Sequence, residues 1–216
     1  HLLKGIKRKE LHRLVLTASG GPFWDKAIED PDLDEALAHP TWRMGKKISI
    51  DSATMMNKGF EVVEAHWLFK VPFDRIDTVI HPQSIVHSLV ETVDGELYAQ
   101  LGPNDMRHPI QNALTHPHLY ETPLARLRLE DLGKLAFHPM DHAKFPLLGL
   151  AYACGRKGGT ALTVLNAANE AAVGLFLERR IRYRQVHGLV ERALERHAFR
   201  RKPGLNEILE LDREVK

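Results

Sequence analysis

Side chains that could bind an anion are concentrated in residues 39–64. Ser52, Thr54 and Asn57 offer hydroxyl and amide groups, and Lys58 adds a positive charge directly after them. Groups of these types at the start of a helix form anion sites, because hydrogen bonds between charged partners are strong. The same residue types also cap helices, and a single lysine is commonly a solvated surface residue. The density of polar groups favours a binding site over a purely structural turn.

Two carboxylates follow one helical turn later. Glu61 and Glu64 are three residues apart, which places them on one side of a helix. A carboxylate beside an anion site could hold a divalent cation, which prefers oxygen ligands, or it could move a proton. Glu64 could also be a bystander on the same helix.

A short strand and a helix are the elements expected to position these groups. Ile48 and Ile50 alternate with polar residues, which is the two-residue period of a half-buried strand. From Phe60 onward the apolar residues fall at helical spacing. Gly59, in the turn between them, would let the backbone approach a ligand closely.

Two loops precede this stretch. Residues 19–22, Ser-Gly-Gly-Pro, follow an apolar strand and could form an ordinary turn or a ligand-binding loop. Trp42 lies between polar loop residues, where a tryptophan is commonly a local core anchor. It could instead act as a hydrophobic shutter that closes over a substrate and excludes water.

Periodicity predicts the remaining elements. Strands are expected over 13–17, 76–80, 85–93 and 96–101, and helices over 32–38, 110–114, 147–155, 161–179, 183–197 and 205–211, with the end of a helix at 1–11. Asp94-Gly95 predicts a hairpin, and consecutive strands without intervening helices imply antiparallel pairing. Asn166 and Asn169 stand in an alanine-rich run that could bind a ligand but favours close helix packing.

Composition excludes several classes of protein. The 216 residues carry 30 Lys+Arg and 28 Asp+Glu, and this balance argues against a nucleic-acid binder. A single cysteine, Cys154, suits a reducing compartment, and no apolar stretch approaches a membrane span. The histidines are scattered without the spacing of a zinc site. His81 and His87, near and within strands, are expected to be structural, with His87 at most a supporting residue of a site.

The run KKISIDSATMMNKGFEVVEAHWLF (46–69) resembles the substrate-binding core of 1-deoxy-D-xylulose 5-phosphate reductoisomerases. Five further segments match family motifs in the expected order: LTASGGPF (16–23), HPTWRMG (39–45), HPQSIVHS (81–88), AQLGPNDMRHPI (99–110) and TALTVLNAANEAAV (160–173). The resemblance covers essentially the whole chain.

The resemblance implies an enzyme of non-mevalonate isoprenoid synthesis, found in bacteria and plastids. It would convert 1-deoxy-D-xylulose 5-phosphate to 2-C-methyl-D-erythritol 4-phosphate with NADPH and a divalent metal (Mn²⁺, Mg²⁺ or Co²⁺). Cytoplasmic location and a homodimer are implied as well. The matched positions make Glu61 a metal ligand and catalytic with Lys58, and give substrate contacts to Ser19, His39, Trp42, Met44, Ser52, Asn57, Lys58 and Met106.

The family also uses a nucleotide domain and an Asp-Ser-Glu-His metal motif that have no counterpart in these residues. We therefore expect the catalytic and C-terminal portion of a longer enzyme, inactive by itself. A sugar-phosphate-binding module or a dimerisation fragment is the alternative. The expected fold is α+β: a small, mostly antiparallel sheet flanked by helices (1–106, with a mobile lid at about 19–46), a connector (107–140) and a C-terminal helical bundle (141–216).

Overall fold

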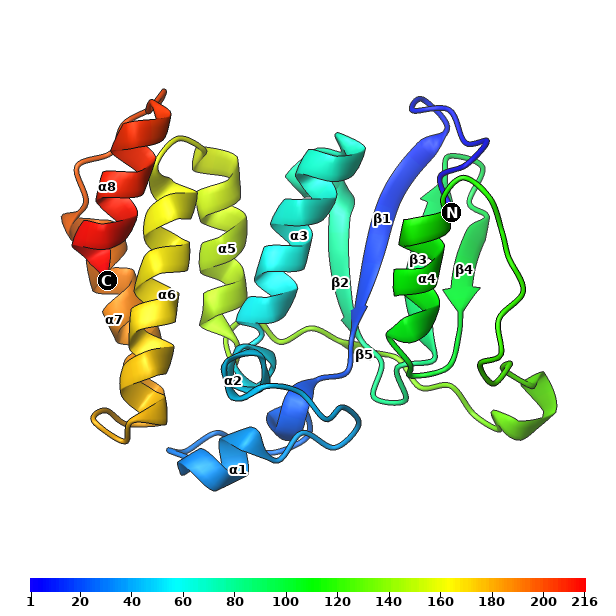
Figure 1. Ribbon diagram of the computed structural model, residues 1–216, viewed down its shortest axis with the longest axis horizontal. Helices are drawn as coiled ribbons and strands as arrows, with labels where there is room; N and C mark the ends of the chain where they lie inside the picture. The colour runs from blue at the N-terminus through cyan, green and yellow to red at the C-terminus, as the bar shows by residue number, and fades with distance from the viewer.

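The computed structural model describes residues 1–216 and contains one five-stranded sheet with helices stacked beside it (Figure 1). The strand order is β4-β3-β1-β2-β5. The strands are β1 (Leu11–Ala18), β2 (Ile76–Ile80), β3 (Val86–Thr92), β4 (Leu97–Leu101) and β5 (His138–Pro139). The expected α+β class is confirmed.

The central position in the sheet belongs to β1. It pairs with β2 in parallel and with β3 antiparallel, while β3–β4 and β2–β5 are antiparallel. The predicted hairpin is confirmed at Gly95, whose φ is 89°. The expectation that consecutive strands pair is wrong for β2 and β3, because β1 lies between them. The continuous apolar run of residues 14–16 suits a strand buried within a sheet.

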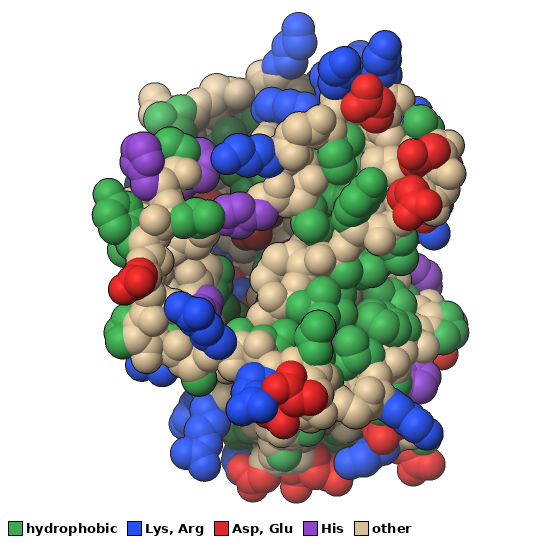
Figure 2. Space-filling model, turned by 90° about the vertical axis from the view of Figure 1, so that its right-hand side faces the viewer, with side chains coloured by type: hydrophobic (Ala, Val, Ile, Leu, Met, Phe, Trp, Pro, Cys, Tyr) green, Lys and Arg blue, Asp and Glu red, His purple; other side chains and the backbone are tan.

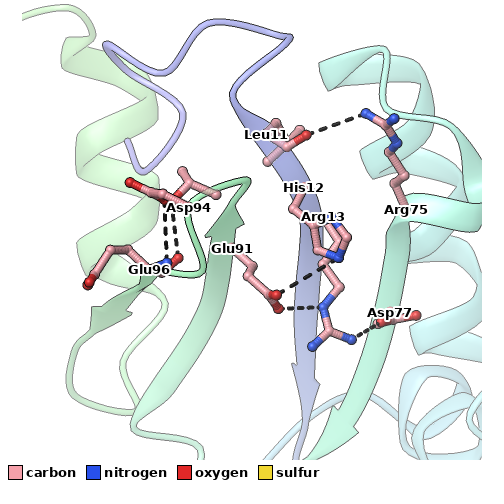
Figure 3. A network of polar contacts seen from close by, with 9 residues as sticks. Leu11, His12, Arg13, Arg75, Asp77, Glu91, Asp94 and Glu96 are labelled. Carbon is pink, nitrogen blue, oxygen red and sulfur yellow. Dashed lines mark hydrogen bonds and ion pairs between the residues drawn. The ribbon is translucent and has the colours of Figure 1, made fainter.

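The two faces of the central strands differ in chemistry. On one face Arg13 of β1 donates to Glu91 Oε2 of β3 at 2.6 Å and to Asp77 Oδ2 of β2 at 2.5 Å (Figure 3). On the other face Leu14 pairs in register with Ile76 and Val90, and all three are buried in one core cluster. This alternation follows from the two-residue period of a strand. It directs the apolar face toward the helices.

Helices α3 (Met56–Phe69) and α5 (Pro146–Lys157) pack on each other beside the sheet, and α6 (Ala161–Leu177), α7 (Tyr183–Arg196) and α8 (Leu205–Val215) form an outer bundle (Figure 1). The predicted helices of the C-terminal third are confirmed, and the last one continues to Val215. A second core cluster joins this bundle to the preceding helices. None of the helices combines the length and apolar character that crossing a membrane requires.

The three remaining helices are shorter. They are α1 (Leu33–Leu37), α2 (Lys46–Ala53) and α4 (Arg107–Thr115). Asp32 caps α1: Glu35 N donates to Asp32 Oδ1 and Asp32 N to Glu35 Oε2, each at 2.9 Å. This capping box satisfies two free N–H groups at the start of the helix.

The strand expected around Ile48 and Ile50 is wrong, since these residues lie in α2. Ser49, Ile50 and Ala53 are buried while Ile48 is 38% exposed. Buried positions at i, i+1 and i+4 fit a helix, whereas a strand would bury Ile48 and Ile50 on the same face. A four-residue alternation is too short to distinguish the two structures, and packing against α3 and α6 decides it.

The N-terminal prediction is also wrong, because residues 1–10 form turns rather than the end of a helix. Gly5 has a φ of 90°, which an α-helix does not allow. Leu2, Leu3 and Ile6 still pack against the core cluster beneath the sheet. The spacing of these apolar residues therefore arises because they are packed from a turn, and it does not indicate a helix.

Gly59 lies inside α3 rather than in a turn, and it faces another helix instead of a ligand. A Cβ atom added there would lie 2.6 Å from the Cβ of Ala151 on α5. The missing side chain therefore allows α3 and α5 to approach closely. This corrects the expectation that Gly59 serves backbone contact with a ligand.

We expect Gly59→Ala to lower the free energy of unfolding by about 1–3 kcal/mol, the usual cost of overpacking a core. Gly149→Ala on α5 is the matched control, because a Cβ there meets no atom within 4 Å. That change should stabilise the chain by about 0.5–1 kcal/mol through helix propensity. Urea denaturation of both variants measures the difference, and equal stabilisation by the two changes would contradict the packing role of Gly59.

Candidate functional site

One cavity of 1160 Å³ lies beside the sheet, with α2 and α3 on one side and α4 on the other. Its wall also includes the ends of β1 and β4 and part of β3. Figure 2 shows this side of the molecule hollowed, with histidine side chains near the opening. All nine predicted site residues line it: Ser19, His39, Trp42, Met44, Ser52, Asn57, Lys58, Glu61 and Met106.

A sharp bend between two helices brings the serine and the lysine to the same cavity. Met55 joins α2 to α3 with a φ of 61°, a left-handed conformation that is uncommon for a residue with a side chain. Ser52 on α2 and Lys58 on α3 therefore both face the cavity. Thr54, at the bend, instead donates to the carbonyl of Asp51 at 3.3 Å. The N-cap of α3 is Met55, and no side chain caps this helix, so the capping alternative describes neither Ser52 nor Thr54.

The Ser19 hydroxyl is held so that its own proton is free. His39 Nδ1 accepts from the backbone N–H groups of Thr41 at 3.0 Å and Trp42 at 2.9 Å. The ring proton must then be on Nε2, which donates to Ser19 Oγ at 2.9 Å. Burial lowers the pKa of His39, which also favours the neutral ring. Ser19 can therefore donate its hydroxyl proton to an anionic ligand.

On α3 a carboxylate is held between an amide and an ammonium group. Asn57 Nδ2 donates to Glu61 Oε1 at 2.7 Å, and Lys58 Nζ forms an ion pair with Glu61 Oε2. These contacts are possible because residues three and four apart share one helix face. Lys58 is only 8% exposed, so its charge acts in a setting with little water. Burial, followed by the charge of Glu61, raises the pKa of Glu64, while Lys58 opposes the shift.

Apolar side chains from two separate segments also line the cavity. Trp42 and Met44 lie in irregular chain just before α2, and both are partly exposed. Met106 lies on the opposite side, at the start of α4, and is 58% exposed. The cavity thus has polar groups on α2 and α3 and exposed or partly exposed apolar side chains elsewhere in its wall.

Several residues of the cavity were missed or underrated. His87 of β3 lines the cavity and is about half buried, which lowers the pKa of its ring. Gln100 of β4 and Asn112 of α4 also line it. No local pattern marks these positions, since they reach the cavity only through sheet pairing and the return of α4. His81 is structural, as expected: its Nδ1 contacts Ala136 O at 2.8 Å, and it is fully buried.

The carboxylates present do not complete a metal site. No group of three or more His, Cys, Asp or Glu side chains is arranged to hold an ion. Glu61 and Glu64 are the acidic residues of α3 that line the cavity. Because Mg²⁺ and Mn²⁺ take about six oxygen ligands in total, a full protein donor set would need groups beyond these two.

Comparisons with known proteins identify the family of the chain. A family model described as "DXP reductoisomerase C-terminal domain" matches residues 101–216, and one described as "1-deoxy-D-xylulose 5-phosphate reductoisomerase C-terminal domain" matches residues 1–69. A reductoisomerase of this name from Synechococcus sp. is 54% identical over 97% of this chain and 54% of its own length. The Bacillus subtilis protein is 49% identical over 99% of this chain and 57% of its own length.

Solved structures of reductoisomerases have a similar fold. A DOX-P reductoisomerase in complex with NADPH, fosmidomycin and magnesium has a TM-score of 0.88 and 44% identity, covering 95% of this chain and 53% of that one. The Zymomonas mobilis enzyme in complex with NADPH has a TM-score of 0.89 and 39% identity, covering 96% of this chain and 54% of that one. The chain thus spans about half the length of the relatives that it matches.

Proposed function

This chain belongs to the 1-deoxy-D-xylulose 5-phosphate reductoisomerase family, and from that premise we propose that its cavity binds 1-deoxy-D-xylulose 5-phosphate. The observation that carries the proposal is the convergence of hydroxyl, amide and ammonium groups from separate elements on one cavity. A sugar phosphate needs such a set of donors, because its charged oxygens lose water on binding.

The phosphate end of the ligand is assigned to Ser19, Ser52, Asn57 and Lys58. Lys58 supplies charge, and the hydroxyl of Ser19 has a proton to donate. Asn57 and Lys58 already share Glu61, so they are ordered before a ligand arrives. Such preorganisation lowers the entropy cost of binding.

The opening of the cavity is assigned to the lid at about residues 19–46. Trp42 and Met44 line the cavity, and within the same segment His39 Nε2 donates to Ser19 Oγ at 2.9 Å. Closure of Trp42 over the ligand would exclude water and strengthen the electrostatic contacts inside. We propose a catalytic unit at 1–106, a connector at 107–140 and a supporting helical unit at 141–216.

We further propose that a full-length enzyme containing this chain converts 1-deoxy-D-xylulose 5-phosphate to 2-C-methyl-D-erythritol 4-phosphate. The carbon skeleton would rearrange to a branched aldehyde, which NADPH would reduce. Lys58 would hold the substrate while Glu61 serves as one ligand of a divalent metal. The solved relatives with NADPH and magnesium support these cofactors, although the carboxylates of this chain complete no metal site.

A homodimer in the bacterial cytoplasm completes the proposal. Large apolar side chains are exposed on the edge strand β4, where Leu97 is 54% and Tyr98 is 50% exposed. Figure 2 shows apolar side chains gathered on this end of the molecule. Exposed apolar patches of this kind mark interaction surfaces in soluble proteins. The bacterial relatives and the single buried thiol support a reducing, cytoplasmic location.

A sugar-phosphate-binding module without catalysis is the second candidate. The incomplete set of metal-binding carboxylates favours it for the 216 residues tested alone. Both candidates bind the same sugar phosphate, so a binding measurement tests the ligand that they share. Only a measurement of turnover distinguishes the enzyme from the binding module.

Calorimetric titration of the 216-residue chain with 1-deoxy-D-xylulose 5-phosphate, with and without Mn²⁺, tests the proposal. We expect binding that does not need the metal, because the phosphate donors are already ordered. Methyl phosphate in excess should compete with the substrate. Absence of substrate binding in both conditions would overturn the proposal for this chain.

A further inference from the structure

Two buried hydrogen bonds connect α2 to the C-terminal helices. Asn169 Nδ2 on α6 donates to Asp51 Oδ1 at 2.9 Å, and Tyr183 Oη on α7 donates to Ala53 O at 2.9 Å. The two partners on α2 stand on either side of Ser52 in the sequence. Ser52, one of the four residues assigned to the phosphate, therefore lies between the two bonded positions.

The groups that make these bonds are removed from solvent. Asn169 is fully buried, Asp51 is 2% exposed and Tyr183 is 7% exposed. Lys47 on α2 adds an ion pair to the second oxygen of Asp51 at 2.5 Å. The Oδ1 atom of Asn169 has no hydrogen-bond partner. Apolar residues in place of both Asn169 and Asp51 would avoid that desolvation penalty, so stability is not what this polar pair chiefly provides.

The two hydrogen bonds restrict the rotation and sliding of α2, which apolar packing alone does not. Ile50 and Ala53 bury α2 against the core cluster, but such contacts are non-directional and tolerate rotation or sliding of a short helix. The two hydrogen bonds have defined donor and acceptor positions, so they fix its rotation and height.

The position of the loop that carries Ser19 depends on the position of α2. A Cβ atom added to Gly21 would lie 2.8 Å from the carbonyl oxygen of Ser52, so the end of α2 is in direct contact with the loop that carries Ser19. A shift of α2 would therefore disturb both serines of the cavity.

We propose that Asn169 and Tyr183 are positioning residues of the ligand site, which hold α2 so that the Ser52 hydroxyl meets the phosphate. The C-terminal helices would then determine affinity for the sugar phosphate in addition to supporting the fold. This inference rests on the proposed function, because it needs Ser52 to contact the ligand.

Tyr183→Phe tests the proposal with little disturbance of packing. We expect the affinity of the 216-residue chain for 1-deoxy-D-xylulose 5-phosphate to fall about fivefold in calorimetry, the scale of one lost hydrogen bond. Tyr152→Phe is the matched control: Tyr152 is 8% exposed and donates to Ile76 O at 2.8 Å, away from the cavity. It should lower the melting temperature similarly and leave the affinity unchanged. Equal affinity losses in the two variants would overturn the proposal.

A double-mutant cycle separates positioning from general support. If Tyr183 acts through Ser52, Tyr183→Phe should change affinity less than about twofold when Ser52 is already alanine. A full fivefold loss in that background would contradict the proposal. Asn169→Leu should lower the affinity as well, with an added loss of stability because it leaves the buried Oδ1 atom of Asp51 without its donor. Failure of the unmodified chain to bind would refute the proposed function itself, whereas unmodified binding without these losses refutes only the positioning role.

Discussion

Lys58→Met should weaken binding of 1-deoxy-D-xylulose 5-phosphate by about 10- to 100-fold. The lysine is 8% exposed, lines the cavity and is already held by Glu61. Hydrogen bonds to charged groups contribute about 1.5–3 kcal/mol, and each 1.4 kcal/mol corresponds to a factor of ten in affinity. Methionine keeps the unbranched apolar stem of the side chain and lacks the charged ammonium group with its donors.

Calorimetric titration at low and high ionic strength provides the measurement. Lys70→Met is the control, because Lys70 is exposed at the other end of the same helix and does not line the cavity. Its removal makes the same change in net charge. A comparable loss of affinity in both variants would show that overall charge, rather than a contact of Lys58, attracts the ligand. In a full-length enzyme, Lys58→Ala should raise KM and lower kcat.

Glu61→Gln should weaken the metal dependence of a full-length reductoisomerase that contains this chain. We expect the Mn²⁺ concentration for half-maximal activity to rise by about 10- to 100-fold, the range reported even for residues that only orient a metal ligand. Glutamine has nearly the same shape and can still accept from Asn57, which donates to Glu61 at 2.7 Å. The change therefore removes charge while preserving the packing.

An activity titration with Mn²⁺ checks this expectation. Glu195→Gln on the exposed side of α7 is the control, since it makes the same chemical change away from the cavity. If the activation curve of Glu61→Gln coincided with that of the unmodified enzyme, Glu61 would not be a metal ligand. The remaining role of Glu61 would then be to form the ion pair with Lys58.

Most strands and helices could be predicted from local patterns. The apolar run around Leu16, the Asp94-Gly95 turn and the long periodic segments near the C-terminus each contain their own signal. Long periodic helices are well determined because many positions must agree with one buried face. The cap at Asp32 also has a local cause, because its hydrogen bonds lie within three residues of the chain.

The short segments were decided by their surroundings. Residues 46–53 have a strand-like alternation but form α2, because they pack between α3 and α6. The left-handed Met55 that turns α2 into α3 has no signal in its residue type. Tertiary contacts outweigh local preferences that amount to less than about 1 kcal/mol per residue.

The sequence by itself determined which residue types are available for binding a phosphate and a metal, and it determined the family through six ordered motifs. Only the tertiary structure decided that these residues meet in one cavity. It also turned Asn169, expected to pack through its small neighbours, into a hydrogen-bond partner of Asp51, which lies 118 positions away in the chain. Hydropathy and spacing describe the preferences of neighbouring residues, whereas contacts at such a separation arise from packing of the whole core.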